Sequence, residues 1–229
     1  TGEHYVAHDR LQYRQMLRAA MGAGLVIAVM ALIKIGMAKL KAAPLVEAFL
    51  FSINYSFGFM LVHVLHFTIA TKQPAMTAAH IADAIHKGSG DEATVDSMAN
   101  LAIKVFRTQF VAILGNVCVV MPTAWLIALA GYWINGSHWV TPEKALKLLH
   151  DIDPLQSLAL FHAAIAGVCL FLAGLISGYH DNTAIYHQIP ERIAQLPWLQ
   201  RLLGKQRAER LGRYLGDNLG GLAGNFYFG

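Results

Sequence analysis

Residues 17–38, LRAAMGAGLVIAVMALIKIGMA, decide the fold because they form an apolar run long enough to cross a lipid bilayer. At about 1.5 Å per residue, roughly 20 helical residues span the hydrocarbon core of about 30 Å. Arg18 and Lys34 are the charged residues of this run, and Lys34 lies near enough to its end to extend its ammonium group to the interface. The stretch therefore predicts a membrane-spanning helix rather than a cleavable signal peptide, whose apolar part is shorter.

The composition of the whole chain agrees with a membrane protein. Of its 229 residues, 55% are hydrophobic and 14% are charged, whereas soluble domains carry about 25% charged residues. The formal net charge of +4 is too small for a strongly basic nucleic-acid module, and Cys118 and Cys169 alone provide no disulfide framework. Composition excludes these two classes together with intrinsic disorder.

Three further apolar runs match the first in length, at residues 44–70, 110–134 and 155–177. The second opens with Pro44, a residue favoured at the start of a helix. The third contains Pro122, which frees a backbone carbonyl and is expected to kink the helix. The predicted fold class is all-α, a polytopic helical membrane protein with about four transmembrane helices plus amphipathic interfacial helices.

The segments between the runs have helical periodicity as well. Residues 76–86 and 93–107 repeat apolar residues at helical spacing, which predicts two amphipathic helices. Thr141, followed by Pro142, predicts the start of a short helix on the outer side that ends near Asp151.

The tail of the chain is amphipathic after Gly204. Its apolar residues form one stripe, made of Leu211, Tyr214, Leu215, Leu219 and Leu222. The arginines of the tail avoid this stripe, which predicts a helix lying on the anionic inner leaflet. Residues 220–229, GGLAGNFYFG, then turn apolar and aromatic, so we expect a piece of a longer protein that continues into a further span. We divide the chain into a transmembrane domain, residues 1–186, and a cytoplasmic-face tail, residues 187–229.

The basic residues are unevenly distributed between the two sides of the membrane. If all four runs cross the bilayer, 13 Lys and Arg residues lie on the side that holds both termini and 5 lie on the other. By the positive-inside rule, both termini then face the cytoplasm.

The helical rise places one group of polar residues near the inner boundary of the membrane: His63, His66, His180, Asp181 and Asn182. His63 and His66 are three residues apart, about 60° around a helix, so both could meet one metal ion or anion, with Asp181 completing the site. A proton relay could use the same groups. The simpler alternative is that both histidines lie at the headgroup level and bond water or lipid phosphate.

Three polar residues fall at membrane depth, where such side chains are costly: Asn54, Asn116 and His162. The asparagines are expected to form hydrogen bonds between helices rather than to line a substrate site. His162 is expected to be a satisfied packing residue, with ligand binding or gating as the alternative.

Several strings of residues resemble the bacterial family named site-specific recombinase, of the Gcr type. The strings are Asn54-Tyr55-Ser56, residues 65–79 (LHFTIATKQPAMTAA), 173–179 (AGLISGY) with Asp181-Asn182, 189–193 (IPERI), 196–199 (LPWL) and 222–226 (LAGNF). The resemblance covers about residues 50–229. It implies an integral protein of the bacterial inner membrane that is longer than this chain and has further membrane spans.

Three functions stay open at this point. The preferred one is a non-enzymatic membrane role in transport, channel formation or assembly, with the lipid bilayer and further transmembrane helices as partners. The second follows the family name, a membrane-associated DNA recombinase; no recombinase motif surrounds Tyr186, its candidate nucleophile. The third is a metal-dependent membrane enzyme built on His63, His66 and His180. The tail cations that could contact DNA or anionic lipid are Arg201, Lys205, Arg207, Arg210 and Arg213.

Overall fold

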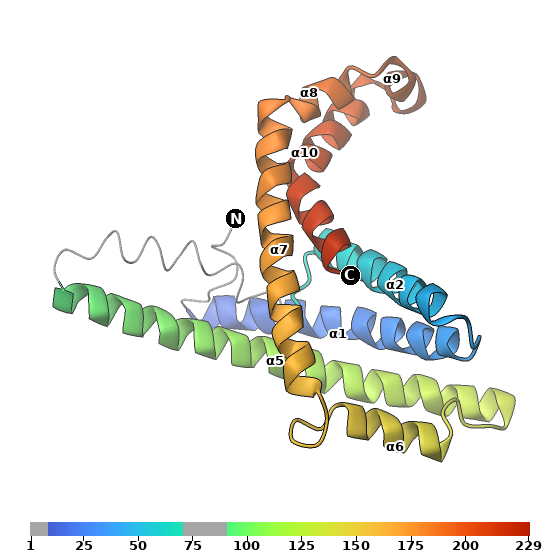
Figure 1. The fold of residues 1–229 in the computed structure, drawn as a ribbon. Helices are drawn as coiled ribbons and strands as arrows, with labels where there is room; N and C mark the ends of the chain where they lie inside the picture. Colours follow the sequence, from blue (N-terminus) through green and yellow to red (C-terminus); the bar gives the residue numbers. More distant parts are fainter. Residues whose placement is uncertain (1–8, 71–90) are drawn as a thin grey trace.

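The computed structural model describes residues 9–70 and 91–229, with the side chains of residues 9–70 and 99–229, and in this part of the chain it consists of helices joined by turns and loops, without a strand. Its elements are α1 (Arg10–Ala38), α2 (Pro44–Val64), α5 (Asp91–Asn135), α6 (Pro142–Asp151), α7 (Ala159–Tyr186), α8 (Ile189–Ala194), α9 (Pro197–Leu203) and α10 (Lys205–Phe228) (Figure 1). Four helices, α1, α2, α5 and α7, are long and apolar enough to cross a membrane. The predicted fold class is confirmed. The helix predicted at residues 76–86 lies outside the described residues.

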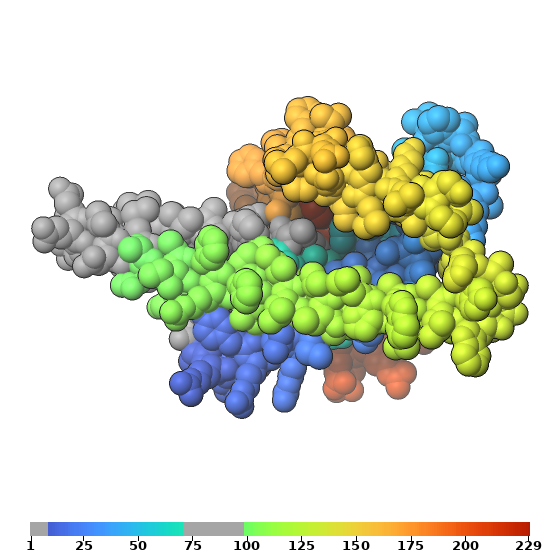
Figure 2. Space-filling view, turned by 90° about the horizontal axis from the view of Figure 1, so that it is seen from below, coloured from blue at the N-terminus to red at the C-terminus, as the bar shows by residue number. Residues whose placement is uncertain are grey.

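Small residues form the contact between α1 and α5, which lie side by side in Figures 1 and 2. Ala20 of α1 and Ala112 of α5 are completely buried in one cluster, and Gly24 of α1 lies against Val119 of α5. A Cβ atom added to Gly115 of α5 would lie 2.7 Å from the Cβ of Ala20, so a glycine is needed at that crossing. The two backbones therefore approach closely, as they do in pairs of helices packed in lipid.

The second span ends at Val64, six residues before the predicted end at residue 70. The chain turns at His66, whose φ of 55° is left-handed, and the Phe67 N–H donates back to the Val62 carbonyl. The following segment then lies against α1, where the Thr68 N–H donates to the Ala19 carbonyl at 3.2 Å. Residues 65–70 are a connecting segment because tertiary hydrogen bonds replace those of the helix.

The third span is one end of a longer helix. α5 is continuous over 45 residues, so it joins the amphipathic helix predicted at residues 93–107 to the span predicted at 110–134, and it continues through Pro122. A helix in a membrane protein tolerates such a proline where neighbouring groups satisfy the freed carbonyl. α6 begins where predicted, since the Thr141 side chain caps it by accepting from the Lys144 N–H, and it ends at Asp151.

The fourth span begins at Ala159 rather than at residue 155. The Asp153 carboxylate accepts the N–H groups of Leu155 and Gln156 at 2.8 and 3.0 Å, which holds the chain in a turn. These two N–H groups lower the pKa of Asp153 because they stabilise its ionised form. Ser157 Oγ then accepts from the Ala159 N–H, so the helix starts there.

A stripe of small residues at every fourth position attaches α10 to its neighbours. Its buried members are Ala208, Gly212, Gly216, Gly220 and Gly224. Gly212 and Gly216 lie against Pro190 of α8, and Gly224 lies against the Ala173 carbonyl of α7. The predicted leucine stripe is different: its leucines are half-buried beside this contact and Tyr214 is exposed. The small-residue stripe is therefore the centre of the packing face of α10, and the predicted leucine stripe is its flank.

The helices form two groups that run in different directions. In Figure 1, α7 runs across the direction of α1 and α5, and α10 runs back along the C-terminal half of α7 until it reaches α2. The N-terminal half of α7 is exposed on all sides within the described structure, from residue 160 to 169. If all four helices cross one flat bilayer, α7 must turn relative to α1 and α5, so the orientation of the four spans stays a prediction.

We expect Gly220→Ala to lower the free energy of unfolding by about 1–3 kcal/mol, because the new methyl group overpacks the contact with Ser177 and Asp181. Gly174→Ala is the matched control on α7, where a Cβ meets nothing within 4 Å. It should be neutral or stabilising by up to about 1 kcal/mol, since alanine favours a helix. Unfolding of both purified variants in detergent measures the difference. Equal stability would contradict the assigned contact.

Candidate functional site

The candidate site lies where α10 passes between α2 and α7. We call it the α10 seam and define it by His63, Asp181, Asn218, Gly220 and Gly221. His63 Nε2 lies 3.1 Å from Asn218 Oδ1, and the Gly220 N–H donates to Asp181 Oδ1 at 3.1 Å. Two consecutive glycines thus face a carboxylate on α7 and an imidazole on α2.

The glycines are the reason that these polar groups approach α10 so closely. A side chain at Gly220 would occupy the position of the Asp181 carboxylate, and one at Gly221 would occupy the position of the His63 ring. Without a Cβ, the helix backbone is accessible to both side chains. The seam can therefore hold α2 and α7 together through hydrogen bonds to one turn of α10.

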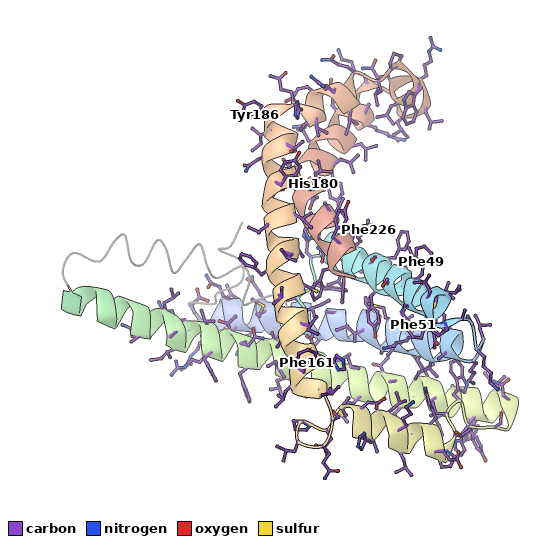
Figure 3. All side chains as sticks on the ribbon, viewed as in Figure 1. Phe49, Phe51, Phe161, His180, Tyr186 and Phe226 are labelled. Atoms are coloured by element: carbon purple, nitrogen blue, oxygen red, sulfur yellow. The ribbon has the colours of Figure 1, made fainter. Side chains whose placement is uncertain are left out.

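The structure brings His63 and Asp181 to this seam, but it places the other members of the inner-boundary group elsewhere. His66 is exposed in the turn after α2, and Asn182 is exposed on α7. His180, labelled in Figure 3, has Nδ1 at 2.9 Å from the Ile176 carbonyl of its own helix. His63 and His66 do not share a helix face, because α2 ends between them.

The described side chains contain no group of three His, Cys, Asp or Glu residues that could hold a metal ion. The metal site predicted from the sequence requires His63 and His66 on one helix face, with the Asp181 carboxylate completing it. A turn separates His66 from that helix face. The polar groups that the structure brings together form hydrogen bonds, His63 with Asn218 and Asp181 with the Gly220 N–H.

The apolar end of the seam fixes α10 to α2. Ser56 Oγ donates to the Phe226 carbonyl at 2.7 Å, and the rings of Phe59 and Phe228 stack with centroids 5.3 Å apart. Figure 3 shows Phe226 where the two helices meet. Asn225 is buried, and its Oδ1 has no hydrogen-bond partner among the described residues.

Asn116 forms a second polar site, the Asn116 joint, which links α1, α5 and the segment after α2. Its Nδ2 donates to the Ala20 carbonyl at 2.7 Å and to the Thr68 carbonyl at 3.1 Å. Its Oδ1 accepts from the Ala70 N–H at 3.0 Å. Gln109 adds a bond from Nε2 to the Ala70 carbonyl at 2.7 Å. The joint satisfies backbone groups that the end of α2 leaves without helical partners.

The remaining polar residues that the sequence predicts at membrane depth, Asn54 and His162, have different surroundings in the structure. Asn54 Nδ2 donates to the Met30 carbonyl at 2.9 Å and so links α2 to α1. His162 is exposed near the start of α7, with its ring 6.1 Å from the ring of Phe161. The two asparagines therefore act between helices, whereas His162 faces the surroundings of α7.

The tail cations are all exposed: Arg201 on α9, and Lys205, Arg207, Arg210 and Arg213 on the first half of α10. Sequence reasoning missed Gln109, Asn218, Asn225 and the glycine stripe. The glycines had a signal, since small residues repeat every fourth position from 208 to 224. The amides had none, because an isolated Asn or Gln shows no periodicity.

A family model described as site-specific recombinase matches residues 1–229. No curated protein and no solved structure matches the chain.

We expect Asn116→Ala to lower the free energy of unfolding by roughly 1–3 kcal/mol, because it leaves the Ala70 N–H without its acceptor. Asn54→Ala is the matched control, since it removes one bond to a helix carbonyl. Such a bond contributes about 0.6 kcal/mol on average in membrane proteins. Unfolding by denaturing detergent compares the two variants. An equal or smaller loss for Asn116→Ala would show that the joint does not hold the bundle.

Proposed function

The chain belongs to the site-specific recombinase family, and from this premise we propose that it is an integral membrane protein with a non-enzymatic role in assembly. Its location would be the bacterial inner membrane, where its helices pair with further transmembrane helices. One observation carries the proposal: few residues of the four long apolar helices are fully buried, and α7 is the most open of the four. In the most apolar 18-residue stretch of each helix, the share of residues that is buried is 33% in α1, 22% in α2, 17% in α5 and 6% in α7.

Exposed apolar surface of this extent is costly in water. Each Å² of apolar surface exposed to water costs about 25 cal/mol. Exposed apolar patches on soluble monomers rarely exceed a few hundred Å². In a bilayer the same side chains contact lipid tails without this cost. The exposed side chains of α5 and α7 include Trp133, Ile134, Leu160 and Phe171.

The polar groups support assembly over transport. Asn54, Ser56 and Asn116 donate to backbone carbonyls of neighbouring segments, so their side chains hold helices together. A transport path would instead use such groups to line a water-filled cavity. The N-terminal half of α7 has apolar side chains on every face, which suits contact with further helices and lipid.

DNA recombination, the activity in the family's description, has less support from the geometry. A tyrosine nucleophile needs basic side chains around the phosphate that it attacks. Tyr186 is 89% exposed, and in Figure 3 it lies on the side of α7 that faces away from α10. Four of the five tail cations are on α10.

The two native cysteines provide a direct test of membrane insertion, since Cys118 of α5 and Cys169 of α7 are both exposed on the protein surface. We expect neither to react with a membrane-impermeant maleimide, in intact cells or in inverted vesicles, because lipid covers them. Both should react after denaturation. Ser137→Cys, in the exposed connection between α5 and α6, is the control and should react from the outer side. Rapid labelling of Cys169 in membranes, or removal of the protein by alkaline washing, would overturn the proposal.

A role in assembly makes a separate prediction about size. In mild detergent, the protein solubilised from its native membrane should migrate on a native gel as a complex larger than one copy. The open half of α7 should mediate part of this contact, so Gly167→Leu should shrink the complex while Ser137→Cys leaves it unchanged. Migration of the wild-type protein as a single copy would contradict assembly and leave membrane insertion intact.

A further inference from the structure

The register of α10 against α7 places the tail cations at one end of a candidate membrane span. Gly224 lies beside Ala173, Gly220 lies beside Asp181, and Gly212 lies beside Pro190 just beyond the end of α7. The N-terminal half of α10 therefore lies beyond the apolar part of α7, and its C-terminal half lies alongside it. If α7 crosses a bilayer, the arginines before Gly216 lie at the level of the headgroups.

Three arginines follow one face of α10. Arg207, Arg210 and Arg213 are spaced by three residues, so they span about 120° of the helix circumference. All three are exposed, on the side opposite the glycine stripe. From residue 197 to 217 the sequence has five Lys and Arg residues and two carboxylates, Glu209 and Asp217. The surface is therefore positively charged.

An exposed apolar pair lies on α9, the short helix that directly precedes α10 and contacts it. Trp198 is 61% exposed and Leu202 is 74% exposed, one helical turn apart, while Leu199 between them is buried against the fold. Tryptophan is favoured at membrane interfaces, where its ring enters the headgroup layer. A surface for DNA or free phosphate would use the cations without needing the exposed tryptophan and leucine.

We propose that this surface, the α9–α10 basic face made of Trp198, Arg201, Leu202, Lys205, Arg207, Arg210 and Arg213, binds anionic phospholipid headgroups. The inference rests on the proposed membrane insertion and adds a lipid preference to it. The guanidinium groups pair with lipid phosphates, while Trp198 and Leu202 insert among the headgroups. This binding would hold α7 and the helices packed around α10 at one leaflet of the membrane.

A fluorescence titration tests this binding. The protein, with Cys118 and Cys169 replaced by serine, carries an environment-sensitive dye at Gln206→Cys, an exposed position beside the arginines. It is reconstituted into phosphatidylcholine vesicles with increasing phosphatidylglycerol. We expect a blue shift that saturates with phosphatidylglycerol, is absent in pure phosphatidylcholine and is weakened by salt. Each of Arg207→Gln, Arg210→Gln and Arg213→Gln should weaken the apparent affinity by roughly fivefold.

Matched variants separate the sources of binding. Lys144→Gln on α6 removes an exposed cation elsewhere and should change nothing. Trp198→Ser with Leu202→Ser should weaken the response without changing the net charge, which pure charge attraction would not produce.

An equal response in both lipids, or insensitivity to the arginine substitutions, overturns the inference. A blue shift produced by duplex DNA in detergent, and by no lipid, would assign the surface to nucleic acid. Alkaline washing precedes the titration, so protein stripped from the vesicles is recognised as failure of the proposed insertion itself.

Discussion

The close approach of the α10 backbone to its neighbours is the constraint on which the C-terminal half of the structure depends. Gly220 and Gly224 let α10 meet α7, and Gly212 and Gly216 let it meet Pro190 of α8. This approach brings the Gly220 N–H to the Asp181 carboxylate and the backbone at Gly221 to the His63 ring. The same register determines that the apolar end of α10 reaches α2 and that its cationic end extends beyond α7.

The N-terminal half depends on a different solution to the same physical problem. Backbone polar groups that are away from water need hydrogen-bond partners. Where α2 ends, its last carbonyls and the N–H groups of the following segment have no hydrogen-bond partners within a helix. Asn116 and Gln109 supply partners from α5 to the connecting segment at Thr68 and Ala70. One side chain, Asn116, thereby joins three parts of the chain that are far apart in sequence.

These two arrangements agree with a protein that assembles in a membrane. The polar side chains inside the fold are used to fasten helices, and the apolar ones are left outward, where lipid or further helices can cover them. The α9–α10 basic face would add a preference for one leaflet. Figure 1 shows that α7 and α1 run in different directions, so the two groups of helices do not form one parallel bundle in this structure.

The sequence alone determined the helical class, the positions of the four long apolar helices and the cap of α6, because hydrophobic run length and capping are local properties. It also drew attention to Asn54 and Asn116. The tertiary structure decided the end of α2, the start of α7 and the separation of His66 from His63, since each depends on hydrogen bonds or turns that no periodicity records. It likewise decided which stripe of α10 is buried. Leucines and glycines both repeat at helical spacing there, and the choice depends on how closely a neighbouring backbone approaches.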